Sequence, residues 1–327
     1  MRSFQQVKQF IFYVCVALTL LSCTKSDGVV RLTLGHTLDT RHVVHIAMEH
    51  MAEKLAEYSN GTMIIEIYPG GQLGSEREMI ELLQIGSLSM TKVSASPLEG
   101  FVPEMKIFSI PYLFRDRSHF WKVLDSDVGQ NLLKKTDAVR LKGMAYYDAG
   151  SRSFYTSTAP IRTPDDLIGK KIRVLNSPTA MAMVKSLGGA AAPIAWGELY
   201  AALQQGVVDG AENNPPSYYL SRHYETARYY TLDEHTFVPD IILASLPVWN
   251  SLNEQQQAWL QQAMDDSVVF QKSLWQKASD DALAAVIAEG VEVIYPDKQA
   301  FRDKVVEFHA SYDGTVVAEQ IKLIKSM

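Results

Sequence analysis

The segment 253–289 limits the possible folds most, because its 37 residues contain neither glycine nor proline. Ser251 and Glu254 form a capping-box pair at its start, and Gly290 stands where a helix C-terminal cap belongs. A helix of this length would run on the order of 50 Å, which exceeds one small domain. We therefore expect one helix that spans two structural units. The apolar residues hold no heptad repeat, which argues against a coiled coil, and a kink near Ser279 remains an alternative.

Strands alternate with helices on both sides of Gly150. The pattern predicts strands at 29–35, 62–68, 88–93, 143–147, 154–157, 171–175, 191–195, 209–213, 229–233 and 241–246. It predicts the shorter helices at 42–58, 75–85, 179–187 and 198–206, with a further one from Pro216. Strands that alternate with helices favour an α/β fold with doubly wound parallel sheets. No low-complexity linker separates the two halves, so we expect them to share crossing strands.

The N-terminus has the pattern of an export signal. Arg2 and Lys8 precede an uncharged apolar run, 10–21, which is too short for a bilayer core of roughly 30 Å. The run ends in Leu-Leu-Ser-Cys at Cys23, which resembles a bacterial lipobox. We predict a signal peptide at 1–22 and a lipidated tether at 23–28, with ordinary signal-peptidase cleavage nearby as the alternative.

Cysteine content and charge exclude several classes of protein. The chain has two cysteines, and cleavage before Cys23 would leave only that one, so no internal disulfide is expected. There are 31 basic and 37 acidic residues and no basic run longer than a pair, which argues against nucleic acid as a partner. The sequence contains no glycine-rich nucleotide-binding loop, no His-Glu-x-x-His zinc motif and no Gly-x-Ser-x-Gly motif of serine hydrolases, so no cofactor is predicted.

Two acidic or histidine clusters have simpler interpretations than a metal or catalytic site. His42, His45 and Glu49 share one helical face, but zinc needs three or four ligands with supporting partners, so a solvated helix is the better interpretation. Asp165 and Asp166 follow Thr163-Pro164 and are typical of the acidic first turn of a capped helix. An enzyme with a dispersed site stays open, but no motif indicates one.

Two arginines at strand ends are the first candidates for ligand binding. Arg173 lies inside the apolar strand 171–175, which Asn176 closes, and Arg152 lies where the chain enters the second unit. A buried arginine is costly unless it meets an anion. The partner is either an internal acid or a ligand carboxylate or phosphate held by the planar fork of donors. An edge-strand position facing solvent is a third interpretation.

The segment 209–216 is the second candidate region. It places a carboxylate and the amide of Asn213 at a strand end before two prolines, which suits hydroxyl recognition, although an Asn/Pro turn is an equal alternative. Trp196, Tyr218 and Tyr219 could stack on a sugar face, but single aromatic residues more often belong to a core.

These segments, in this order, resemble the extracytoplasmic solute receptors (DctP type) of tripartite ATP-independent periplasmic (TRAP) transporters. The motifs are Tyr-Pro-Gly-Gly-Gln-Leu-Gly at 68–74, Ile-Pro-Tyr-Leu-Phe at 110–114, Leu-Ile-Gly-Lys-Lys-Ile-Arg-Val at 167–174 and Asp-Gly-Ala-Glu-Asn at 209–213. The resemblance implies a two-lobed periplasmic-binding-protein-like fold that closes around a small organic acid, with the long helix across both lobes. We expect lobe I at 29–150 plus about 239–278, and lobe II at 151–238 plus about 279–327.

The resemblance also implies roles for individual residues. Arg173 grips the ligand carboxylate, Arg152 is a second cation at the cleft, and Asn213 is the cleft amide. The remaining expected ligand-binding residues are Asn176, Trp196, His36, Ser94, Glu76, Tyr218 and His235. Sialic-acid-binding members carry a glutamate where this chain has Ser94, which argues against that ligand.

Three stretches look most like members that bind hexuronates: 176–178, 195–200 and 213–219. We therefore expect a non-enzymatic periplasmic receptor that delivers glucuronate or galacturonate to a sodium-driven membrane permease. C4-dicarboxylates and other sugar acids are the alternative ligands, because Arg152 would suit a second carboxylate. A receptor for an ATP-driven importer or a sensor kinase, and an exported hydrolase or lyase, are the alternative functions. Contact with a membrane is expected only through lipid at Cys23.

Overall fold

The computed structural model describes residues 28–327, so the predicted signal peptide and the lipidation site Cys23 lie outside the described residues. The long predicted helix is α10, Glu254–Ala288. Its capping box is formed by Asn253 and Gln256, not by the expected Ser251 and Glu254. Ser251 instead ends the preceding helix α9, where its hydroxyl donates to the carbonyl oxygen of Val248 at 2.6 Å.

Lobe I, as we call the first sheet with its helices, has five strands in the order β2-β1-β3-β10-β4. Its strands are β1 (Val30–Gly35), β2 (Met63–Tyr68), β3 (Met90–Ser94), β4 (Leu141–Tyr147) and β10 (Asp240–Ser245). Its helices are α2 (Val43–Tyr58), α3 (Glu76–Gln84), α4 (Arg117–Leu124), α5 (Asp127–Lys135) and α9 (Leu246–Ser251), with the short 3-10 helices η1 (Ser96–Gly100) and η2 (Pro103–Ser109). The predicted capping box of Ser75 and Glu78 opens α3 and is confirmed.

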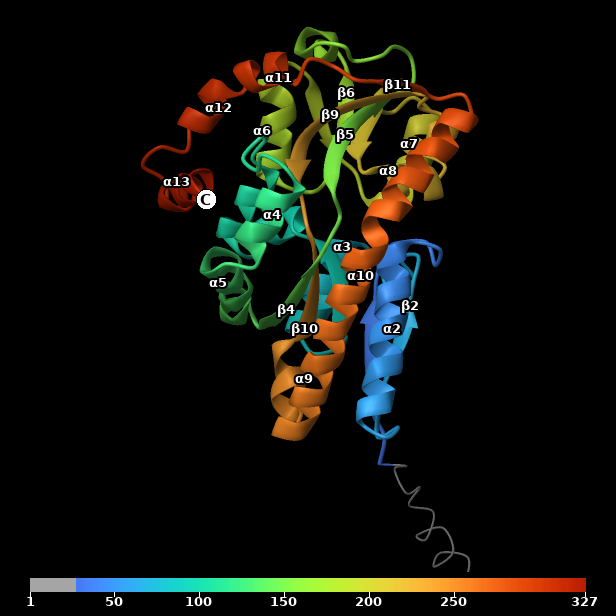
Figure 1. Ribbon diagram of the computed structural model, residues 1–327, viewed down its shortest axis with the longest axis vertical. Coiled ribbons are helices and arrows are strands. Elements are labelled where there is room, and N and C mark those ends of the chain that lie inside the picture. The colour runs from blue at the N-terminus through green and yellow to red at the C-terminus, as the bar shows by residue number, and fades with distance from the viewer. Residues whose placement is uncertain (1–27) are drawn as a thin grey trace, which may run out of the picture.

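Lobe II is built on a six-stranded sheet in the order β11-β9-β5-β8-β6-β7. Its strands are β5 (Ser151–Thr156), β6 (Lys171–Val174), β7 (Ala190–Pro193), β8 (Gly210–Asn213), β9 (Tyr229–Phe237) and β11 (Glu292–Ile294). Its helices are α6 (Pro178–Ser186), α7 (Leu199–Gln204), α8 (Pro215–Leu220) and α11 (Lys298–Lys304), with the 3-10 helix η4 (Pro164–Leu167). The two lobes lie one above the other in Figure 1.

Both sheets are mixed, and not purely parallel as the alternation of strands and helices predicted. β1, β2 and β3 are parallel, as are β6, β7 and β8, but β10 is antiparallel to β3 and β4, and β5 is antiparallel to β8 and β9. The chain enters lobe II from β4 to β5 and returns from β9 to β10. One pair of strands carries the chain into lobe II and the other carries it back, so the two pairs run in opposite directions. Strand β9 extends to Phe237, opposite Ser151, and does not end at Asp233 as predicted.

Helix α10 packs on α2 and β4 of lobe I and on α8 of lobe II (Figure 1). Leu260 and Trp275 belong to a core cluster of lobe I, whereas Val286 belongs to the core of lobe II. Between Leu260 and Trp275, the buried Gln271 accepts from the backbone N–H of Asp148 and donates to its carbonyl oxygen, both at 2.8 Å. The predicted shared helix is therefore confirmed. From residue 28 onward, no helix is both long and apolar enough to cross a membrane.

The C-terminal segment returns to lobe I, although we expected residues 279–327 on lobe II. The helices are α11, α12 (Val306–Ala310) and α13 (Ala318–Ser326). Phe301 of α11 packs in lobe II, but Ile321 and Ile324 of α13 join the core of lobe I. His119 of α4 contacts the carbonyl oxygen of Ile324 at 2.9 Å. The apolar side of α13 thus covers aromatic residues around α4, and Figure 1 shows the two helices side by side.

Candidate functional site

Two adjoining hollows between the lobes, which we call the front cleft, contain most of the expected site residues. The larger has a volume of about 360 Å³ and the smaller about 30 Å³. They share Glu76 from lobe I and Leu175 and Trp196 from lobe II as lining residues. Other lining residues are Ser94, Pro97, Lys92 and Asp240 from lobe I, and Arg152, Arg173, Asn176, Asn213, Asn214 and Ser217 from lobe II.

Arg173 of β6 is a buried cation for which the described residues provide no acidic partner. The residue is 2% exposed, its Nε donates to the carbonyl oxygen of Ile194 at 2.9 Å, and its Nη1 has no hydrogen-bond partner. The guanidinium carbon lies 5.6 Å from the centre of the Trp196 ring. Burial lowers the pKa of Arg173, as expected for a charge that is removed from water. An anion entering the larger hollow would remove this penalty.

Arg152 of β5, by contrast, is part of an internal salt bridge. Its Nε and Nη2 donate to the two carboxylate oxygens of Glu212, and its Nη1 donates to Oδ1 of Asn213 at 2.9 Å. Burial alone would raise the pKa of Glu212, but Arg152 and His235 together outweigh burial and lower this pKa to about 2. Arg152 lines the cleft with its charge already compensated, which corrects the expectation of a second free cation.

This salt bridge also orients Asn213. The Oδ1 atom of Asn213 accepts from Arg152 and from the backbone N–H of Asn214, both at 2.9 Å. In the described part of the chain Nδ2 has no hydrogen-bond partner, so the amide offers a donor to the smaller hollow. Asn214 is the N-cap of α8, and its side-chain amide donates a hydrogen bond to the carbonyl oxygen of Ala149 at 3.0 Å, in the segment between β4 and β5.

The lobe I wall centres on Lys92, a residue that the sequence analysis did not select. Lys92 is 2% exposed and lies 3.0 Å from Asp240 and 3.4 Å from Glu76. Burial alone would lower the pKa of Lys92, but the two carboxylates outweigh burial and raise it. Ser94 donates its backbone N–H to Glu76 at 2.9 Å and its hydroxyl to Asp240 at 3.2 Å. Two acids face one cation, so this wall has an excess of negative charge.

Three expected site residues do not line the front cleft. Tyr218 is in the core of lobe II, where its hydroxyl donates to the carbonyl oxygen of Ala227 at 2.5 Å. His36 is fully buried and pairs with His45 at 2.9 Å, and burial with the charge of Lys92 lowers its pKa to about 3. His235 is fully buried, 2.8 Å from Asp233 and 3.7 Å from Glu212, the partner of Arg152. The sequence predicts the helix that contains Tyr218, but it does not reveal which face of that helix is buried, and the predicted strand 229–233 stops short of His235.

The expected solvated helix is wrong for the two histidines, since His42 and His45 are only 3% and 5% exposed, but both the histidine and the aspartate clusters have structural roles. His45 pairs with Glu49 at 3.2 Å, and no group of three or more histidine, cysteine or acidic residues between residues 28 and 327 could hold a metal ion. Asp166 completes a capping box with Thr163 at the start of η4, as the Thr-Pro-Asp-Asp sequence predicts.

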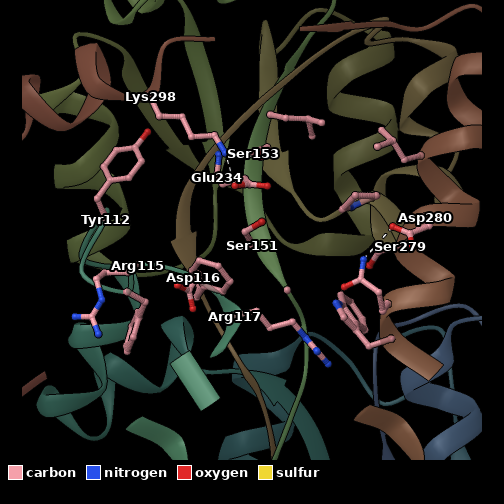
Figure 2. Close-up of a pocket in the computed structure, with 18 of the residues that line it drawn as sticks. Tyr112, Arg115, Asp116, Arg117, Ser151, Ser153, Glu234, Ser279, Asp280 and Lys298 are labelled. Atoms are coloured by element: carbon pink, nitrogen blue, oxygen red, sulfur yellow. Dashed lines mark hydrogen bonds and ion pairs between the residues drawn. The ribbon is translucent and has the colours of Figure 1, made fainter. Parts of the chain in front are cut away.

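A second cavity of about 330 Å³, the rear cavity, lies on the other face of the crossing strands (Figure 2). Ser151 and Ser153 line it, whereas Arg152 between them lines the front cleft, as the alternation of side chains along a strand requires. Its charged residues include the ion pair of Lys298 and Glu234 and the largely exposed Arg302. No buried, unpaired cation lines this cavity among the residues that the structure describes.

Comparison with known proteins agrees with this geometry. Residues 34–315 match the family "Bacterial extracellular solute-binding protein, family 7". The protein YiiZ of Salmonella typhimurium is 39% identical over 312 residues, which cover 94% of each chain.

Two solved structures are also similar along almost the whole chain. The TRAP periplasmic solute-binding protein of Pseudomonas putida F1, with bound D-glucuronate, has a TM-score of 0.88 and 35% identity, covering 91% of this chain and 97% of its own. That of Xanthobacter autotrophicus Py2, with bound β-D-galacturonate, has a TM-score of 0.87 and 35% identity, covering 90% and 99%. The chain therefore belongs to family 7 of the bacterial extracellular solute-binding proteins and is a TRAP periplasmic solute-binding protein.

Proposed function

We propose that this protein captures a hexuronate such as glucuronate or galacturonate in the front cleft and delivers it to a sodium-driven membrane permease. The observation that carries the proposal is the buried guanidinium of Arg173, whose Nη1 has no partner. A planar fork of N–H donors matches the two oxygens of a carboxylate and replaces its hydration in one fixed geometry. One ligand carboxylate at Arg173 would balance this charge.

The opposite wall of the cleft favours hydroxyl groups over a second carboxylate. Glu76 and Asp240 exceed the charge of Lys92, so their oxygens are suited to accept hydrogen bonds from ligand hydroxyls. The amide of Asn213 adds a donor. A sugar acid presents one carboxylate and several hydroxyls, which matches a cleft with a positive end and a negative end. The uronates bound by the two solved relatives have this composition.

The C4-dicarboxylate alternative loses its main support. It depended on Arg152 as a free second cation, but Arg152 is paired with Glu212, and Lys92 is paired with two acids. Arg77, the other cation that lines the cleft, is 3.0 Å from Glu81. A second ligand carboxylate would therefore meet the negatively charged wall of lobe I.

A ligand panel tests the proposal. Binding to the folded protein raises its stability by RT ln(1 + [L]/Kd), so the melting temperature reports affinity. We expect D-glucuronate or D-galacturonate to raise the melting temperature most, neutral D-glucose to leave it unchanged, and succinate to have a smaller effect. Recovery of unchanged ligand from the complex would separate a receptor from an enzyme. A larger shift with succinate than with either uronate would contradict the proposal.

We also propose that lipid on Cys23 anchors the protein to a membrane. The apolar run 10–21 and the Leu-Leu-Ser-Cys sequence support this proposal. Cys23→Ser should move the protein from the membrane fraction to the soluble periplasmic fraction, with unchanged ligand affinity. Identical fractionation of the variant and the parent would contradict lipid anchoring without affecting the proposed ligand.

A further inference from the structure

Glu99 is a buried carboxylate of lobe I whose partners lie in lobe II. It is on η1, directly after β3, and is 8% exposed. No cation in the described part of the chain forms an ion pair with it. A buried carboxylate without a cation needs several hydrogen bonds to offset its lost hydration. These bonds come from the other lobe.

The partners of Glu99 are the first residues of helix α6. Ser177 donates its hydroxyl to Oε2 at 2.5 Å, and Thr179 donates its hydroxyl to Oε1 at 2.7 Å and its backbone N–H to Oε2 at 3.2 Å. Ser177 is the N-cap of α6 and also accepts from the N–H of Ala180 at 3.0 Å. The N-terminus of a helix favours negative charge, so one lobe supplies the anion that the helix of the other lobe attracts.

This contact adjoins the front cleft on both sides. On lobe II, the chain runs from Arg173 to Asn176, which both line the larger hollow, and continues directly into Ser177. On lobe I, Pro97 lines the same hollow two residues before Glu99. Glu99 therefore fastens the segment that contains Arg173 to the opposite wall of the cleft, although it lines neither hollow itself.

We propose that Glu99 is a positioning residue that holds the Arg173–Asn176 segment against lobe I in the arrangement described, and thereby sets how slowly the ligand leaves. The inference rests on the front cleft as the binding site, but it does not depend on which acid is bound. Glu99 acts through Ser177 and Thr179 and does not touch the ligand. Its loss should therefore change the dissociation rate constant and leave the association rate constant almost unchanged.

Binding kinetics with D-glucuronate test this inference in the full-length protein. Charge-assisted hydrogen bonds are the strong ones, so we expect Glu99→Gln and Thr179→Val each to raise the dissociation rate about tenfold or more. The association rate should stay within about twofold. Thr179→Ser keeps the hydroxyl and should restore slow dissociation. Glu57→Gln, which changes an exposed carboxylate of lobe I, is the matched control.

Two further measurements separate the possible outcomes. In a double-mutant cycle, Glu99→Gln and Thr179→Val should show coupled, non-additive effects on dissociation, because they remove the same contact. Lower apo melting temperatures with unchanged dissociation rates would show a purely structural contact and overturn the inference. If D-glucuronate does not bind the parent, the proposed ligand is wrong, and the acid that gives the largest shift in the panel becomes the kinetic probe for the same variants.

Discussion

The front cleft and the rear cavity lie on opposite faces of the same crossing strand, yet they differ in the state of their charges. Along β5, Arg152 faces forward while Ser151 and Ser153 face the rear. The larger front hollow and the rear cavity have similar volumes, about 360 and 330 Å³. Among residues 28–327, only the front has a buried cation, Arg173, without an acidic partner. An uncompensated buried charge therefore distinguishes the two cavities better than size does.

The largest expected difference is between the cations of the two cavities. Breaking a buried ion pair costs roughly 3–5 kcal/mol, so Arg173→Ala should weaken uronate binding by about two to three decades or more. Arg173→Lys keeps the charge but loses the planar fork and should recover only part of the loss. Arg302→Ala in the rear cavity should change the affinity less than about twofold. Calorimetric titration of the three variants measures these effects.

The apo protein provides the control for Arg173. Removing Arg173 leaves no buried acid unpaired in the part of the chain that the structure describes, so the apo melting temperature of Arg173→Ala should not fall markedly. Near-parental affinity of this variant, or an effect of Arg302→Ala of equal size, would contradict the distinction between the two cavities.

The second prediction concerns pH and the network behind the front cleft. Burial alone would lower the pKa of His235, but Asp233, with Glu212, outweighs burial and raises this pKa to about 9. Charged His235 thus adds about 3 kcal/mol of stability that is fully present below about pH 6.5 and lost as the pH rises through 9. Urea unfolding should show His235→Gln less stable than the parent at pH 6 by about this amount.

At pH 9.5 this difference should have largely disappeared. The rear ion pair of Lys298 and Glu234 is partly exposed, so Glu234→Gln should show no comparable change between pH 6 and 9.5. A constant difference between the parent and His235→Gln at both pH values would exclude a charged His235 as the cause.

The third prediction concerns Gly150, which lines the rear cavity. Its φ is +59°, and a Cβ there would lie 2.8 Å from Nε1 of the buried Trp275 ring. Gly150→Ala should destabilise the protein by roughly 1–3 kcal/mol, as overpacking does. Gly61→Ala is the control, because Gly61 also has a positive φ but no atom within 4 Å of the added Cβ. Equal losses for both variants would show that φ alone, and not the contact with Trp275, is responsible.

The smallest effect is expected from a larger side chain in the rear cavity. If the crossings near Gly150 and Val238 are the hinge, closing the front cleft widens the rear cavity. Ser279→Leu adds bulk at the rear and should favour closure, which would raise the affinity about twofold to fivefold. Small-angle scattering of the apo variant should show a more compact molecule than the apo parent. Weaker binding with an expanded molecule would reverse the expected direction of the hinge.

The sequence was sufficient to predict features that depend on local pattern. The absence of glycine and proline at 253–289 predicted α10, and an arginine within an apolar strand marked Arg173. Lys92 has the same signal within β3 and could have been found in this way.

Features that depend on distant contacts could not be predicted. Arg152 is paired with Glu212, which lies 60 residues further along the chain, so no local pattern could show that the charge of Arg152 is compensated. Tyr218 and His235 were expected at the cleft from the resemblance to TRAP receptors, but each side chain has its partners inside lobe II. The antiparallel crossing strands likewise follow from how the chain passes between the lobes, and no local segment determines this.

The two hydrogen bonds between Gln271 and the backbone of Asp148 have a mechanical consequence. They fasten the middle of α10 to the segment that joins β4 to β5, while the two ends of the helix are embedded in different lobes. A rotation of one lobe against the other must therefore either bend α10 or break its contacts with one lobe. Resistance of the helix to such bending would limit how far the two lobes can turn against each other.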